Sequence, residues 1–199
     1  MDHETDWKRV VDRLRADESV VVSQAEIGMT ATPDDFKVIG LLDKALPPSP
    51  ITQFYTLTNG VTIRWSGTVN GQAVQGSVNI LPIVVAAMRA PAQEEGEPLE
   101  GILWNDEFAP GVLKQLKRMT IFEHLAGRSA FLTYLADESD AGLFLVDNDD
   151  IQPIVPDFAA TMTLLQRYAG ADWLREHLTN ADWRQRIDKD VVLQAIAAL

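Results

Sequence analysis

The dipeptide Asn70-Gly71 constrains the fold of this 199-residue chain more than any other feature. Both residues tolerate a positive φ angle, which the tightest two-residue β-hairpin turn requires at both of its central positions. A two-residue turn leaves no freedom in the strand register, so Trp65 must lie opposite Gly76. In this register the apolar residues share one face of the hairpin and the polar residues share the other. The sequence therefore predicts an antiparallel hairpin over Val61–Ile80.

Helices are predicted on both sides of this hairpin. Thr32 precedes Pro33 and two aspartates, a pattern typical of a helix start, and this helix is expected to run to about residue 45. Asp157 is the predicted start of a later helix, and two more helices are expected to begin at Asp172 and Asn180. The helix that is predicted to start at Pro33 carries a broad apolar stripe made of Val38, Leu41, Leu42 and Ala45.

Apolar segments between the hairpin and the later helices predict strands at residues 121–125, 130–135 and 143–146. The order of elements is helices, hairpin, strands and helices again. This order predicts an α+β fold with a central, largely antiparallel sheet, helices packed against it and extra helices at the C-terminus.

The formal net charge of −12 is confined to two segments of the chain. Residues 91–110 contain six carboxylates and residues 137–157 contain seven, and neither segment contains Lys or Arg. Surfaces of this kind repel nucleic-acid phosphates and anionic lipids, so we expect neither nucleic acid nor membrane as a partner. A confined charge run is either a solvated face that favours solubility or a recognition surface, and the sequence leaves both interpretations open.

Sequence motifs for catalysis and metal binding are missing. The chain has no Cys, which excludes disulfides, thiol nucleophiles and thiolate zinc sites. It contains no glycine-rich phosphate loop, nucleophile elbow or His-Glu-x-x-His pattern. The segment 147–150 is the nearest to a metal signal, but a calcium loop would need alternating acids, a following Gly and a later Glu.

We therefore expect no enzyme activity, no cofactor and no bound metal. A hydrolase that holds a metal on Asp147, Asp149 and Asp150 is the less favoured alternative. The acidic start of the chain has no apolar core, so we expect no signal peptide. The longest apolar run, Ile80–Met88, is nine residues long, well short of the roughly 20 that span a bilayer. These features predict a cytoplasmic protein.

The stretch Leu46–Gly67 resembles the signature of the SUKH superfamily, the Smi/Knr-like domains. The pattern is Leu-Pro, a helix with an aromatic pair, Asn-Gly, and then a strand with an aromatic residue. The matching positions are Leu46, Pro47, Phe54, Tyr55, Leu57, Asn59, Gly60 and Trp65. The resemblance covers about residues 30–170 and implies one domain over residues 1–199, with 171–199 as a helical C-terminal extension.

The resemblance also implies a function without catalysis. Most bacterial members of the superfamily look like immunity proteins, which bind and block a polymorphic toxin. The shared motif is structural, so it transfers no catalytic residue to this chain. The alternative that the resemblance leaves open is a cytoplasmic scaffold or regulatory protein of the Smi/Knr type.

Many toxins of these systems are nucleases with basic substrate clefts, so the acidic segments become the predicted partner-binding surface. The expected partner is a cognate toxin with a basic surface, and we expect the chain to be a monomer or a weak homodimer. The first group of predicted binding residues is Asp137, Glu138, Asp140, Asp147, Asp149 and Asp150. The second group is Glu94, Glu95, Asp106 and Glu107.

Overall fold

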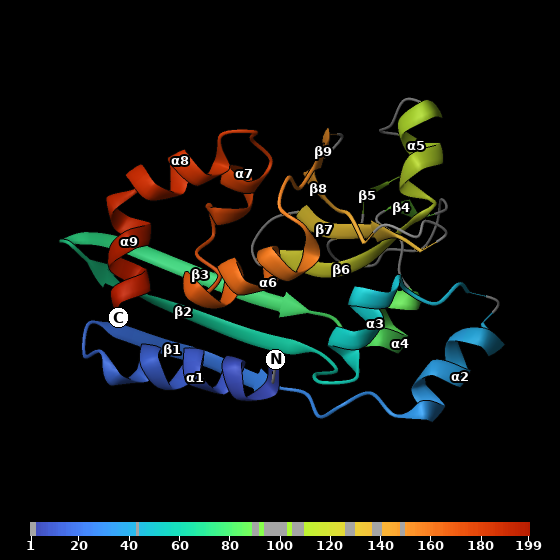
Figure 1. Cartoon of the computed structure of the whole chain (residues 1–199), viewed down its shortest axis with the longest axis horizontal. Coiled ribbons are helices and arrows are strands. Elements are labelled where there is room, and N and C mark those ends of the chain that lie inside the picture. Colours follow the sequence, from blue (N-terminus) through green and yellow to red (C-terminus); the bar gives the residue numbers. More distant parts are fainter. Residues whose placement is uncertain are drawn as a thin grey trace.

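A seven-stranded antiparallel sheet runs through the molecule in the strand order β1-β2-β3-β6-β7-β8-β9 (Figure 1). The computed structural model describes residues 3–42, 44–88, 92–93, 103–104, 110–125, 130–136, 141–147 and 150–199. The strands of the sheet are β1 (Val20–Ile27), β2 (Val61–Val69), β3 (Gln72–Ile80), β6 (Met119–Leu125), β7 (Ala130–Leu135), β8 (Leu143–Asp147) and β9 (Asp150–Pro153). Two short strands, β4 (Ala92–Gln93) and β5 (Leu103–Trp104), pair separately and in parallel.

Helices pack against this sheet, and the chain is α+β as predicted. Those in the described part of the chain are α1 (His3–Ala16), α2 (Pro33–Leu41), α3 (Ser49–Tyr55), α4 (Ile83–Ala87), α5 (Pro110–Leu116), α6 (Phe158–Arg167), α7 (Leu174–Leu178), α8 (Trp183–Lys189) and α9 (Val191–Ala198). None of them has the length and apolar character needed to cross a membrane.

The hairpin of β2 and β3 has the predicted register. Asn70 and Gly71 adopt φ angles of 51° and 75°, the left-handed values that the turn needs. Trp65 pairs with Gly76, and a Cβ atom at position 76 would lie 2.5 Å from the indole Nε1. The missing side chain therefore lets the indole lie flat across the neighbouring strand. From there Nε1 donates a 2.7 Å hydrogen bond to the carbonyl of Ala169, which ties the hairpin to the end of α6.

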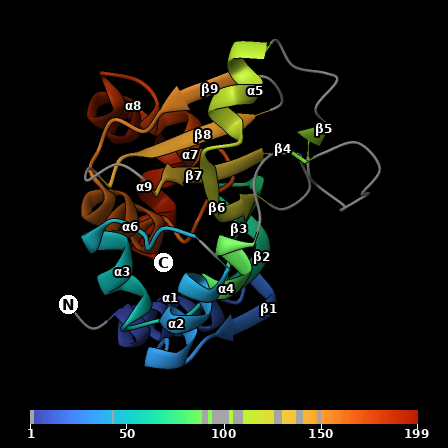
Figure 2. The ribbon, with the colours of Figure 1, turned by 90° about the vertical axis from the view of Figure 1, so that its right-hand side faces the viewer.

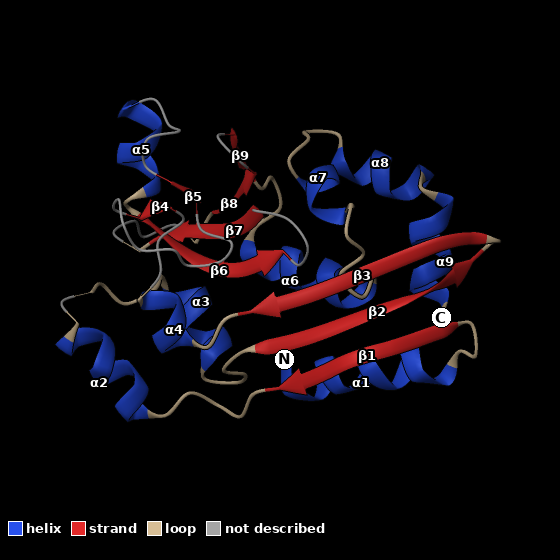
Figure 3. Ribbon diagram, turned by 180° about the vertical axis from the view of Figure 1, so that it is seen from behind, coloured by secondary structure: helices blue, strands red, loops and turns tan. Residues whose placement is uncertain are grey.

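The main core lies between β1–β3 and the helices α1, α6 and α9, while the opposite face of these three strands carries no described helix (Figure 3). A second apolar cluster forms where α4 and α5 pack on the other side of β6–β8. Strand β7 lies between the two clusters and is buried along its whole length. Buried residues of the main core include Trp7, Ile63, Val78, Leu165 and Ile196, and those of the second cluster include Leu116, Ile121, Phe131 and Val146.

Two helix predictions were wrong. Three helices follow α6 instead of two, because Asp190 has an extended backbone that ends α8 and a side chain that caps α9. Helix α2 starts at Pro33 as predicted, but it ends at Leu41 instead of residue 45. Its buried residue is Ile39, whereas its predicted apolar stripe lies exposed.

Candidate functional site

The helix-to-strand corner with the SUKH-like pattern is built around buried aromatic rings. Phe54 and Tyr55 from α3 are both buried. The Phe54 ring meets those of Phe122 and Phe158 edge to face, with centroids 5.5 and 6.0 Å away. Burial raises the pKa of the Tyr55 phenol well above its ordinary value. The phenol therefore stays neutral and donates a 3.1 Å hydrogen bond to the carbonyl of Leu81.

The polar groups of the same corner bind other parts of the chain. The Asn59 side-chain oxygen accepts a 2.8 Å hydrogen bond from the amide of Ile83 at the start of α4. Gly60 has a φ angle of 99°, and its carbonyl accepts a 2.8 Å bond from the amide of Gly28, just after β1. Pro47 is buried and Leu46 is half exposed. Tyr55, Asn59 and Gly60 thus join α3, α4 and the sheet.

Two of the predicted partner-binding residues lie in the described part of the chain. Asp147 ends β8 and Asp150 begins β9, and the two face each other in the hairpin register. Asp147 is half-buried, whereas Asp150 is exposed and accepts a hydrogen bond from the side chain of Gln152. The others lie outside the described residues: Asp137, Glu138, Asp140, Asp149, Glu94, Glu95, Asp106 and Glu107.

The β8–β9 hairpin occupies the end of the sheet opposite β1 (Figure 2). Asp147 and Asp150 lie directly opposite each other on neighbouring strands, a position in which like charges repel. An exposed carboxylate at this edge can be approached by a positively charged partner.

The described residues contain no group of three or more His, Asp or Glu side chains placed to hold a metal ion. The metal-dependent hydrolase alternative needs Asp147, Asp149 and Asp150 together. Only two of these three are described, so the alternative receives no support from the geometry.

Sequence reasoning missed a His–carboxylate pair between α7 and the start of α9. His177 Nε2 lies 3.1 Å from Asp190 Oδ2, and the indole of Trp173 donates to the same oxygen at 2.8 Å. Such a pair activates a nucleophile in hydrolases, but no hydroxyl group of the described residues hydrogen-bonds to this imidazole ring. The arrangement acts as a clamp on the C-terminal helices. Since 13 residues separate the pair, no local sequence signal could have indicated it.

The stability of this clamp should depend on pH through Asp190. Burial acts to raise the pKa of its carboxyl, but bonds from the Leu193 amide, Trp173 and His177 outweigh burial and hold the pKa below its ordinary value. The stabilisation is then complete above pH ~4 and is lost as the pH falls through the lowered pKa. We expect Asp190→Asn, which keeps a capping side chain, to cost about 1 kcal/mol in urea unfolding at pH 7.

The difference between wild type and Asp190→Asn should shrink as unfolding is measured from pH 5 down to pH 3. Asp188→Asn, at an exposed position on α8, is the matched control and should leave the stability unchanged. A difference for Asp190→Asn that stays constant down to pH 3 would contradict the role assigned to the carboxylate.

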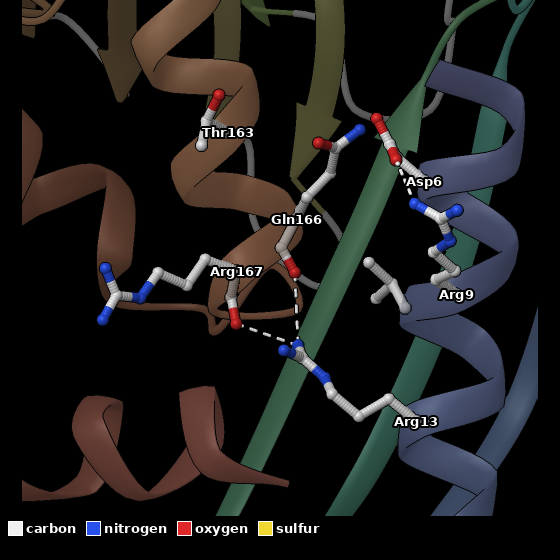
Figure 4. Close-up of a pocket in the computed structure, with 7 residues that line it drawn as sticks. Asp6, Arg9, Arg13, Thr163, Gln166 and Arg167 are labelled. Carbon is white, nitrogen blue, oxygen red and sulfur yellow. Dashed lines mark hydrogen bonds and ion pairs between the residues drawn. The ribbon is translucent and has the colours of Figure 1, made fainter. Parts of the chain in front are cut away.

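A groove of about 370 Å³ separates α1 from α6 and is lined by three arginines (Figure 4). Each arginine already has a partner. Arg13 Nη2 donates to the carbonyls of Gln166 and Arg167 at the negative end of α6, at 3.2 and 2.8 Å. Arg9 pairs with Asp6 at 3.3 Å, and Arg167 points away from α1 and lies against a tyrosine ring. The groove is therefore a seam between helices and gives no reason to assign an anion site.

Two comparisons with known proteins leave the family of this chain open. The chain matches no protein-family model and no curated protein. The resemblance of Leu46–Gly67 to the SUKH pattern therefore stays a prediction.

Proposed function

We propose that this chain is a non-enzymatic, immunity-type protein that neutralises a cognate toxin in the cytoplasm by binding it directly. The observation that carries the proposal is the internal use of the SUKH-like corner. Phe54, Tyr55 and Asn59 make contacts within the fold, as a structural motif without catalytic residues should. This supports a role in which recognition residues lie elsewhere on the surface.

Confined negative charge supports the choice of partner. The chain has a net charge of −12, and its acidic segment 137–157 includes the β8–β9 hairpin, on which Asp150 is exposed. A basic substrate cleft on a nuclease would be attracted to such a surface, and the carboxylates would compete there with nucleic-acid phosphates. Steering of this kind acts mainly on the association rate and weakens as salt screens the charges.

The proposal predicts that a neighbouring gene encodes the cognate toxin. Replacing Asp147, Asp149 and Asp150 by Lys should slow association with the toxin domain of that protein. We expect a decrease of about tenfold at low ionic strength, because steering by charge accounts for 10-fold or more in such rates. The dependence of the rate on salt should also flatten. Stopped-flow mixing at several salt concentrations measures both effects. Reversal of Asp137, Glu138 and Asp140 as well should enlarge them.

The matched control is Asp12, Glu18 and Asp188 changed to Lys, which alters the net charge equally at exposed positions outside the acidic segments. This control should retain most of the wild-type association rate. Equal slowing in both variants would mean that only the net charge of the chain affects the association rate. An unchanged rate in the hairpin variant would show that the carboxylates of the hairpin do not attract the toxin.

A further inference from the structure

The chain contains two Asn-Gly dipeptides, and the fold places them in different surroundings. Asn70-Gly71 forms the turn between β2 and β3, and both of its residues are exposed. This turn lies at the far end of the long hairpin, at the edge of the molecule (Figure 3). Asn59-Gly60 lies in the corner between α3 and β2, where Asn59 is half-buried and Gly60 is buried.

An asparagine that precedes glycine loses its side-chain amide more readily than any other, because glycine has no Cβ atom to hinder the attack of its own amide nitrogen. That nitrogen gives its proton to the solvent and bonds to the asparagine Cγ, while the side-chain NH2 takes a proton from the solvent and leaves as ammonia. Water then adds to one of the two carbonyl carbons of the five-membered ring, and the bond from that carbon to the ring nitrogen breaks. Release of Cγ gives aspartate, and release of the main-chain carbon gives isoaspartate.

The fold leaves Asn70-Gly71 open to this reaction. Within the described ranges of the chain, no residue forms a hydrogen bond with the side-chain amide of Asn70. Apart from its chain neighbours, no heavy atom of those ranges lies within 4 Å of the position that a Cβ atom of Gly71 would take. The main chain of the turn therefore has room to move the Gly71 nitrogen toward the side chain of Asn70.

Contacts within the fold oppose the same reaction at Asn59-Gly60. The Asn59 side-chain oxygen accepts the hydrogen bond from the Ile83 amide, and the Asn59 backbone amide donates a 2.7 Å bond to the carbonyl of Met29. A Cβ atom at Gly60 would lie 3.1 Å from the ring of Pro82, so the main chain there is closely packed. The Gly60 nitrogen can reach the Asn59 side chain only if this corner opens.

We propose that Asn70 deamidates spontaneously in the folded protein, whereas the fold protects Asn59 from the same reaction. Isoaspartate at position 70 adds an atom to the main chain of a two-residue turn. Because this turn fixes the register of β2 and β3, the added atom weakens the pairing of Trp65 with Gly76. Both products also add a negative charge to the turn. The reaction needs no partner, so it is independent of the proposed function.

Storage of the folded, full-length chain at physiological temperature, followed by trypsin digestion and mass spectrometry, tests the proposal. Trypsin places Asn59 in the peptide 45–64 and Asn70 in the peptide 65–89. We expect the mass gain from replacement of NH2 by OH to accumulate at least about tenfold faster at Asn70 than at Asn59, because reaction at Asn59 first needs the corner to open. The gain at Asn70 should be faster at pH 8 than at pH 6, since the attacking nitrogen must lose its proton.

The controls are the variant Asn70→Asp and the wild-type chain unfolded in guanidinium chloride. Asn70→Asp has no amide to lose at the turn, so it should show no mass gain at position 70. In the unfolded chain neither dipeptide is held by the fold, and Asn59 and Asn70 should gain mass at similar rates. Equal rates at Asn59 and Asn70 in the folded chain, or no gain at Asn70 there, would overturn the proposal.

Discussion

Replacing Arg175 by Ala is expected to lower the free energy of unfolding by about 3–5 kcal/mol. Arg175 and Glu123 form an ion pair in which each side chain is only 1% exposed. Both guanidinium edges are used, because Nη1 donates to the carbonyl of Gly170 and Nη2 to that of Ser77, each at 2.8 Å. Removal of the guanidinium would leave the buried carboxylate of Glu123 without its cation and would take one donor from each of the buried carbonyls of Ser77 and Gly170.

The position of this ion pair explains why the effect should be large. Strand β3 pairs with β6 only at Ile80 and Glu123, so the sheet divides between these two strands. Beyond the point where β3 and β6 separate, the segment that follows α6 lies beside β3. There the amide of Ser77 donates a 2.9 Å hydrogen bond to the carbonyl of Gly170. Arg175 joins both sides of this division. Its loss should loosen the attachment of the C-terminal helices to the sheet.

Chemical unfolding by urea, followed by circular dichroism, measures this effect. Arg15→Ala, at an exposed position near the end of α1, is the control and should change the stability by less than about 0.5 kcal/mol. The double variant Glu123→Leu with Arg175→Met should recover much of the loss, since no buried charge then lacks its partner. A cost below about 1 kcal/mol for Arg175→Ala would contradict the assigned role.

Phe54→Ala is expected to cost about 3–5 kcal/mol of stability. The Phe54 side chain is almost completely buried, and it contacts three aromatic rings from α3, β6 and the start of α6. Its removal would open a cavity that these rings cannot fill, because they hold one another edge to face. Unfolding by guanidinium chloride measures the loss.

Gln53→Ala is the matched control for this substitution, since Gln53 is the exposed neighbour of Phe54 on α3. It should leave the stability within about 0.5 kcal/mol of wild type. A loss for Phe54→Ala as small as that of the control would mean that the corner does not hold the fold together.

The parts of the fold that were predicted correctly are those with local physical causes. In the hairpin, turn chemistry at Asn70-Gly71 and the alternation of apolar residues both indicate one register. The start of α2 was predictable for a similar reason. Thr32 and Asp35 cap each other, with the Thr32 amide 2.7 Å from a carboxylate oxygen of Asp35. Residues that are three positions apart can be recognised together in a sequence.

The parts that could not be predicted depend on contacts between distant residues. Glu123 and Arg175 are 52 positions apart, and nothing near either residue indicates the other. Periodicity shows that α2 has an apolar face, but it cannot show whether that face meets the sheet or the solvent. The predicted partner-binding residues rest on local charge alone, and two of them, Asp147 and Asp150, lie opposite each other where β8 turns into β9. The exposure of Leu41 had no such signal, because an exposed apolar residue looks like a core residue in a sequence.

Stoichiometry tests the central claim of direct neutralisation most directly. The toxin domain encoded by the neighbouring gene is titrated with the purified full-length chain, and the remaining toxin activity is measured at each ratio. Direct binding predicts a linear fall in activity that reaches zero at one equivalent of the chain, with both proteins recovered chemically unchanged. Full toxin activity at every ratio, or complete loss of activity at a small fraction of an equivalent, would contradict it.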